Sequence, residues 1–272
     1  MSITKRYIDI GGKQIHVRQI GRTAEVPLVL LHQTASSGAM FESLMPLLAD
    51  SFHVIAPDTP GFGASFRPAN TFSVQDLSEA LYTALKLLGV QICYLFGHHT
   101  GAAIAVQMAY DHPDFVRKMI LSGPPLLDEA HIQSLKAGLH PFTITEDGAH
   151  LLAVWERIRR RAPSLSLDIV HREVMLTLSA GQTAQTAYHA VFEQPFAVQL
   201  AALSMPVLVM AGENDTLRTS AASAFSFVKS GALKIIPGEG SYICDQNPQA
   251  VAEVIRAFMV QDVQPGERSG SC

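Results

Sequence analysis

The sequence predicts an α/β fold, a mostly parallel sheet of about eight strands with helices on both faces and an inserted helical cap. First, short apolar runs alternate with segments of helical periodicity, which is typical of strands joined by crossover helices. Second, this alternation stops between residues 126 and 204, where only helical patterns occur. Third, a length of 272 residues accommodates one large α/β domain that carries an insertion.

The first part of the chain begins with a hairpin and continues with alternating strands and helices. Residues 5–10 and 13–20 flank the turn dipeptide Gly11-Gly12 and are expected to pair as antiparallel strands. Ser73, with an aspartate three residues later, predicts the capped start of a helix that ends at about Leu88. The other strands are expected at 27–31, 54–57, 91–96 and 118–121, and the other helices at 39–49 and 101–110.

The second part of the chain contains the insertion and then returns to alternation. Helices are expected at 129–139, 147–161, 166–179 and 184–200, followed by strands at 206–211 and 233–236 and helices at 219–229 and 248–261. The prediction is therefore a core of residues 1–125 and 205–263, a cap of residues 126–204 and a disordered tail of residues 264–272.

Composition and charge exclude several classes of function. A net charge of −4 offers no basic excess for binding nucleic acid. No apolar run is long enough to cross a membrane, and the N-terminus lacks an apolar signal region. Cys93, Cys244 and Cys272 have neither disulfide nor metal-ligand spacing, which favours a reducing compartment. We expect a soluble cytoplasmic protein with a small-molecule substrate, no metal and no cofactor, and the sequence indicates no oligomeric state.

The loops that follow the strands carry the chemistry, because ligands of parallel sheets bind at the carboxyl ends of strands. Residues 95–102 read Leu-Phe-Gly-His-His-Thr-Gly-Ala, a G-x-Nuc-x-G turn from strand to helix with His99 at the reactive position. The other distinctive loops are Leu31-His32, Asp-Thr-Pro-Gly-Phe-Gly at 58–63, Gly-Glu-Asn-Asp at 212–215 and Pro-Gly-Glu-Gly-Ser at 237–241.

These five loops, in this order, resemble the α/β-hydrolase superfamily, in its capped group of esterases, epoxide and haloalkane hydrolases and C–C bond hydrolases. The resemblance implies a catalytic triad in the chain order nucleophile, acid, histidine. Asp215 matches the acid. His99 stands where the family has Ser or Asp, and Ser241 stands where it has His. The two ends of the triad are therefore exchanged.

An exchange of His and Ser between two fixed backbone positions leaves the sum of their side-chain lengths unchanged. We therefore expect that His99 can reach Ser241 at about 2.6–3.2 Å and, oriented by Asp215, act as a general base on Ser241 or on water. The resemblance implies an oxyanion hole made by the backbone N–H groups of Thr34 and Thr100. Gln33 replaces the Gly of the family's His-Gly pair, which places a polar side chain near the substrate.

The predicted reaction is hydrolysis of an ester, an amide or a C–C bond in a small, largely apolar carbonyl compound. Two alternatives stay open. A His–Asp pair without a good nucleophile also suits a lyase, isomerase, cyclase or cofactor-free oxygenase, and the chain could be a non-catalytic ligand-binding relative. His32 and His98 are expected to pack. The arginine run at 157–161 is expected to form a solvated helix face.

Overall fold

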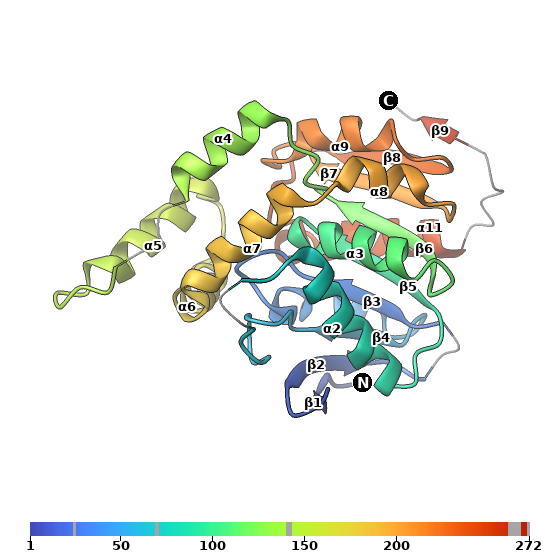
Figure 1. The fold of residues 1–272 in the computed structure, drawn as a ribbon, viewed down its shortest axis with the longest axis horizontal. Coiled ribbons are helices and arrows are strands. Elements are labelled where there is room, and N and C mark those ends of the chain that lie inside the picture. Colours follow the sequence, from blue (N-terminus) through green and yellow to red (C-terminus); the bar gives the residue numbers. More distant parts are fainter. Residues whose placement is uncertain (24–25, 69–70, 140–142, 261–267, 271–272) are drawn as a thin grey trace.

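The computed structural model describes residues 1–23, 26–68, 71–139, 143–260 and 268–270, and its strands form a single sheet (Figure 1). The strands are β1 (Thr4–Asp9), β2 (Gln14–Ile20), β3 (Leu28–Leu31), β4 (Val54–Pro57), β5 (Cys93–His98), β6 (Val116–Ser122), β7 (Val207–Gly212), β8 (Gly231–Ile236) and β9 (Arg268–Gly270). Their order in the sheet is β1-β2-β4-β3-β5-β6-β7-β8-β9. The β1–β2 and β2–β4 pairs are antiparallel and all other described pairs are parallel, so the predicted fold class is confirmed.

Helices connect the strands and cover the sheet. They are η1 (Gly38–Phe41), α1 (Met45–Leu48), α2 (Val74–Leu87), α3 (Thr100–Asp111), α4 (Glu129–Gly138), α5 (Ala149–Arg161), α6 (Leu167–Ala180), α7 (Gln182–Glu193), α8 (Phe196–Ala202), α9 (Arg218–Phe225), α10 (Ile243–Gln246) and α11 (Pro248–Val260). The capping box predicted from Ser73 is present, because its hydroxyl accepts from the Asp76 N–H and the Asp76 carboxylate accepts from the Ser73 N–H. In the hairpin turn, Gly11 and Gly12 have φ of 78° and 81°, which suits glycine.

Two predicted helices are each broken by a proline. The segment 39–49 forms η1 and α1 separately, because Pro46 has no N–H with which to continue a helix from η1. The segment 184–200 is divided into α7 and α8. Gln194, which precedes Pro195, is extended, with ψ of 130°, as sterics before proline favour.

Alternate strand residues point to opposite faces of the sheet and form two hydrophobic layers. In β3, Val29 and Leu31 join the layer that contains α2, α3 and α8, while Leu28 and Leu30 join the layer that contains η1, α1 and α11. The strand ends are thus held rigidly between two helical layers, and the loops beyond them can be positioned accurately.

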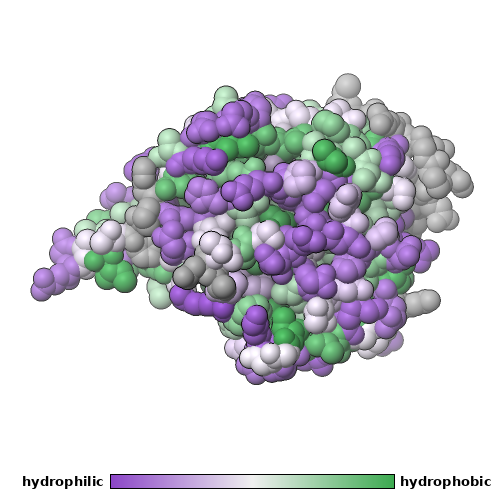
Figure 2. Space-filling view, viewed as in Figure 1, coloured by the Kyte–Doolittle hydropathy of each residue, from purple (hydrophilic) through white to green (hydrophobic). Residues whose placement is uncertain are grey.

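Helices α4–α8, the inserted helices, lie between β6 and β7 in the chain. Figure 1 shows α4, α5 and α6 projecting from the body of the molecule, and in Figure 2 this projection is hydrophilic at its tip. A separate hydrophobic cluster holds α5 and α6 together; its buried members are Val154, Ile158, Leu165, Val170 and Val174.

The tail differs in part from its prediction. Residues 264–267 and 271–272, and with them Cys272, lie outside the described residues. Residues 268–270, expected to be disordered, form β9, which pairs in parallel with Gly231–Leu233 of β8. No helix in the described ranges is long and apolar enough to span a membrane.

Candidate active site

His99 occupies the turn between β5 and α3, with φ of 50° and ψ of −111°. It is the one non-glycine residue with positive φ in the described part of the chain, and such strained conformations concentrate at functional sites. The flanking glycines are required by close packing. A Cβ on Gly97 would lie 2.4 Å from the Gly101 carbonyl oxygen, and a Cβ on Gly101 would lie 2.0 Å from that of Leu31. The predicted elbow is therefore present, with His99 at its tip.

The imidazole of His99 pairs with the carboxylate of Asp215, which follows β7. Nε2 lies 3.0 Å from Oδ1 and 2.9 Å from Oδ2 of a carboxylate with no exposed surface. Burial alone would raise the pKa of Asp215, but the charge and hydrogen bonds of His99 hold this pKa well below its ordinary value. Because a carboxylate only accepts, Nε2 carries the proton. Nδ1 is left without a hydrogen bond among the described residues, and it is the basic atom of the neutral ring.

Ser241 also binds the carboxylate of Asp215. Its hydroxyl donates to Asp215 Oδ1 at 3.3 Å and accepts from the Thr216 N–H at 3.2 Å. The structure thus brings together all three residues of the exchanged triad. The hydrogen bond expected between His99 and Ser241 is not formed in the described part of the chain, because both side chains bind Oδ1 of Asp215 instead.

His98 supports this arrangement from below. It is completely buried and its ring stacks on His99 with centroids 4.2 Å apart. Its Nε2–H donates to the Ser241 carbonyl oxygen at 2.8 Å, so Nδ1 accepts from the Ser122 hydroxyl at 3.0 Å. Burial, and next the charge of His99, lower the pKa of His98 to about 3, so this ring is neutral at pH 7. The predicted packing role of His98 is confirmed.

Thr34 and Thr100 lie next to each other beside the elbow. The Thr34 N–H points to the Thr100 hydroxyl at 3.4 Å, which is a long hydrogen bond, and the Thr100 N–H begins α3. The first N–H groups of a helix have no intrahelical partner, so the Thr100 N–H is available to a ligand. Gln33 precedes this loop and is 7% exposed; its side chain makes no hydrogen bond to the described residues.

His32, expected to pack, is buried and bridges two loops. Its Nδ1 donates to the Gln33 carbonyl oxygen at 2.8 Å, and its Nε2 accepts from the Thr59 N–H at 2.9 Å. This bridge fixes the backbone that leads to Thr34, and the predicted packing role of His32 is confirmed.

A largely buried ionic cluster joins the inserted helix α6 to α10 and to the loop after β3, and sequence reasoning did not identify it. Arg172 of α6 contacts Asp245 of α10 at 2.7 Å and its neighbour Glu173 at 2.7 Å. Glu173 also accepts from the Ser36 hydroxyl at 2.9 Å. Burial raises the pKa values of both Glu173 and Asp245, and the charge of Arg172 opposes this increase. In the sequence, Arg172 and Glu173 are simply two neighbouring charged residues on a predicted helix. Nothing in that pattern indicates that Glu173 binds Ser36, 137 residues earlier, or that Arg172 binds Asp245, 73 residues later.

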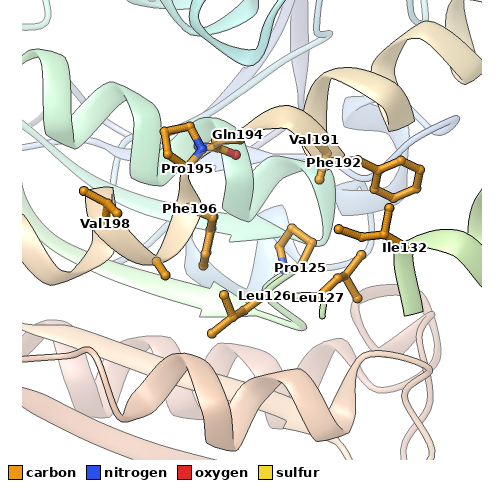
Figure 3. A pocket seen from close by; sticks show the side chains of 11 residues that line it. Pro125, Leu126, Leu127, Ile132, Val191, Phe192, Gln194, Pro195, Phe196 and Val198 are labelled. Atoms are coloured by element: carbon orange, nitrogen blue, oxygen red, sulfur yellow. The ribbon is translucent and has the colours of Figure 1, made fainter. Parts of the chain in front are cut away.

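A cavity of about 220 Å³ lies near the base of the inserted helices (Figure 3). Its lining is largely apolar and consists of Pro125, Leu126, Leu127, Ile132, Val191, Phe192, Gln194, Pro195, Phe196, Ala197 and Val198. The loop after β6 leads from the site to this cavity, since Gly123 lies against His99 and Pro125 lines the cavity. Among the described residues there is no group of three His, Cys, Asp or Glu side chains that could hold a metal ion.

Comparison with known proteins identifies relatives in sequence and in fold. The 2-(acetamidomethylene)succinate hydrolase of Mesorhizobium japonicum is 26% identical over 93% of this chain and 94% of its own. The soluble epoxide hydrolase of a Corynebacterium species is 32% identical over 44% of this chain and 41% of its own. The solved structure of bromoperoxidase from Bacillus anthracis has a TM-score of 0.81 at 19% identity, and that of E-2-(acetamidomethylene)succinate hydrolase 0.78 at 24%. Each of these two alignments covers 95% of this chain and 100% of the solved chain. At sequence identities this low, the likeness shows the fold alone.

A family model described as the α/β hydrolase fold matches residues 26–248, which are most of the chain and include His99, Asp215 and Ser241. The protein is a member of the α/β-hydrolase fold family.

Proposed function

We propose that this protein is a hydrolase in which His99, oriented by Asp215, acts as a general base on a water molecule. The observation that carries the proposal is the pairing of His99 Nε2 with a buried carboxylate at 2.9 Å, which leaves Nδ1 as the basic atom. In the reaction, Nδ1 takes a proton from water as the oxygen attacks a carbonyl carbon. The imidazolium is stabilised by Asp215 and then gives its proton to the leaving group.

Water is favoured over Ser241 as the nucleophile. The Ser241 hydroxyl donates to Asp215 rather than to a nitrogen base, and a carboxylate with a depressed pKa is a weak proton acceptor. In this proposal Ser241 is a positioning residue that holds the carboxylate in the orientation that His99 requires.

The backbone N–H groups of Thr34 and Thr100 are the proposed oxyanion hole. The two residues lie next to each other, and a bound oxyanion would replace the Thr100 hydroxyl as the acceptor of the Thr34 N–H. The Thr100 N–H is at the positive end of the α3 dipole. In this proposal a substrate carbonyl oxygen binds there, and the water on His99 Nδ1 attacks the carbonyl carbon. The Gln33 side chain, which lacks a partner in the described part of the chain, is positioned to bind a polar group of the substrate.

One relative supports acyl hydrolysis of a small compound. The M. japonicum relative, which matches nearly the whole chain, is named for the hydrolysis of 2-(acetamidomethylene)succinate, an amide. The inserted helices make polar contacts with loops at the carboxyl ends of the strands, as in the bond from Tyr188 Oη to the Thr34 carbonyl oxygen at 3.2 Å. We propose that they form a cap, and that the apolar cavity near their base accepts the apolar part of the substrate.

The test compares variants on a panel of short-chain 4-nitrophenyl esters and amides. His99→Ala is expected to lower kcat/KM by about 10² to 10⁴, whereas Ser241→Ala retains activity within about tenfold. His131→Ala is the matched control, because this histidine is exposed on α4. Full activity of His99→Ala would contradict the proposal. Labelling of Ser241 by a fluorophosphonate probe would instead make Ser241 the nucleophile.

A second candidate function is abstraction of a proton from a C–H or O–H group of the substrate, as in a lyase, isomerase, cyclase or cofactor-free oxygenase. This candidate is favoured because no serine, threonine or cysteine side chain among the described residues forms a hydrogen bond with His99 Nδ1. Turnover in ¹⁸O-labelled water separates the two reactions, because only hydrolysis incorporates one solvent oxygen into the acyl product. Ligand binding that survives His99→Ala, without turnover in the wild type, would indicate a non-catalytic relative.

A further inference from the structure

The loop after β3 carries the Thr34 N–H, one of the two donors of the proposed oxyanion hole. A trans peptide group is planar, so this N–H points away from the Gln33 carbonyl oxygen of the same peptide. That oxygen accepts two hydrogen bonds, from His32 Nδ1–H at 2.8 Å and from the Ser36 N–H at 2.9 Å. The contacts that fix His32 and Ser36 therefore set the direction of the Thr34 N–H.

The sheet fixes His32, and an inserted helix fixes Ser36. His32 directly follows β3, and its Nε2 accepts from a backbone N–H of the loop after β4 at 2.9 Å. Ser36 is fully buried, and its hydroxyl donates to Oε1 of Glu173 in α6 at 2.9 Å. Glu173 is held in turn by Arg172, whose Nε and Nη2 both donate to the same oxygen. One of the two residues that direct the Thr34 N–H is thus anchored to α6.

A second inserted helix holds the next peptide of the same loop. Tyr188 of α7 donates its hydroxyl proton to the Thr34 carbonyl oxygen at 3.2 Å. The bonds from Tyr188 and to Glu173 come from different helices, and both act on the four residues 33–36. The geometry of this loop therefore depends on the inserted helices as well as on the sheet.

We infer that Glu173 and Tyr188 are positioning residues that aim the Thr34 N–H at the developing oxyanion. The inference rests on the proposed function, because it gives the inserted helices a part in stabilising the transition state of that reaction. Preorganised donors act on the charge that develops in the transition state more than on the bound ester. Loss of either contact is therefore expected to lower kcat and to change KM little.

Ser36→Ala and Tyr188→Phe each remove one hydroxyl group and break one contact without removing a buried charge. Each variant is expected to lower kcat for 4-nitrophenyl butanoate by about 5- to 50-fold, with KM within about twofold of wild type. Ser37→Ala is the matched control for Ser36→Ala, because this buried hydroxyl accepts from the Ala39 N–H of its own loop. Tyr110→Phe, at an exposed position of α3, is the control for Tyr188→Phe. Both controls should keep wild-type kcat.

A purely structural role for the two hydroxyl groups would not distinguish tetrahedral from planar ligands. Calorimetry on all five proteins compares butylphosphonate, a tetrahedral anion, with butanoate, a planar one. In Ser36→Ala and Tyr188→Phe, butylphosphonate binding is expected to weaken by about the factor by which kcat falls, and butanoate binding to stay within about twofold. Wild-type kcat in either variant, an equal loss in Ser37→Ala, or equal weakening of both ligands would overturn the inference.

The proposed function and this inference fail in different ways. If His99→Ala abolishes hydrolysis while Ser36→Ala and Tyr188→Phe stay fully active, the general base stands and the positioning role is overturned. If His99→Ala keeps full hydrolysis while both hydroxyl variants still lose butylphosphonate binding, the general base fails and the positioning role stands.

Discussion

Two buried histidine–aspartate pairs in this molecule have almost the same geometry. His16 Nδ1 lies 2.8 Å from Asp58 Oδ2, and His99 Nε2 lies 2.9 Å from Asp215 Oδ2. Both carboxylates have no exposed surface, and in both the neighbouring charges overcome burial and lower the pKa. The contact between the two side chains therefore does not by itself indicate a reactive site.

The pairs differ in what else the carboxylate binds. Asp58 accepts from Arg18 at 2.8 Å and from the backbone N–H groups of Gly38 and Ala64, so a permanent cation and two loops are fixed to it. Asp215 has no arginine or lysine partner among the described residues, and its charge is balanced only by a histidine. A permanent cation makes the first pair a structural element. In the proposed mechanism, a histidine in a strained turn, whose Nδ1 has no hydrogen bond among the described residues, lets the second pair move a proton.

The largest expected effect is on the structural pair. Asp58→Asn removes the fully buried anion of the Arg18 guanidinium and leaves it only the partly exposed Glu42, and we expect it to lower the free energy of unfolding by about 3 kcal/mol. Urea denaturation measures the change. Asp215→Asn is the matched variant and should cost less, because no arginine or lysine in the described chain depends on it. Equal destabilisation by the two variants would remove the distinction between the pairs.

The converse holds for activity. Asp215→Asn is expected to lower kcat by about 10² to 10³, since the imidazolium loses its anion and the proton on Nε2 is no longer fixed. Steady-state kinetics with the best 4-nitrophenyl ester measures this loss. Asp58→Asn, assayed at a temperature where it remains folded, should keep kcat within a few-fold of wild type. A comparable loss of kcat in Asp58→Asn would contradict this account.

The stability contributed by the structural pair should also depend on pH. The pKa of Asp58 is lowered from 3.8 to about 2; burial opposes this change, while the hydrogen bond from His16 and the charge of Arg18 produce it. The Asp58 contribution is therefore fully present above about pH 4 and is lost as the pH falls towards 2. It amounts to about 2 kcal/mol. The unfolding free energies of wild type and Asp58→Asn should therefore approach each other as the pH falls from about 4 to about 2. If the two curves stay parallel over this range, protonation of Asp58 does not account for the loss of stability.

The smallest expected effect comes from adding a methyl group beside the reactive pair. Gly123 has φ of 55°, and a Cβ there would lie 2.6 Å from His99 Nε2. Gly123→Ala should displace the imidazole and lower kcat by about tenfold, in addition to its backbone strain. Gly138→Ala is the control, because nothing lies within 4 Å of its added Cβ. A Gly123→Ala protein with wild-type kcat would show that the position of His99 tolerates displacement.

The sequence by itself determined the sheet, the elbow and the positions of the acid and Ser241. The pleat of each strand sends successive apolar residues to opposite layers, and Gly97 and Gly101 define the turn that presents His99. These features depend on neighbours along the chain, so a linear pattern contains them. The two interrupted helices were predicted as continuous because their apolar spacing persists across Pro46 and Pro195, whose backbone constraints outweigh it.

Only the tertiary structure decided which partners the side chains choose. The same residue lengths permit His99 to meet Ser241 or Asp215, and the relative placement of the loops after β5, β7 and β8 selects Asp215 for both. The Arg172 cluster likewise depends on where the inserted helices contact the loops. Such contacts join residues far apart in the chain, where local propensity and periodicity carry no information about distance or direction.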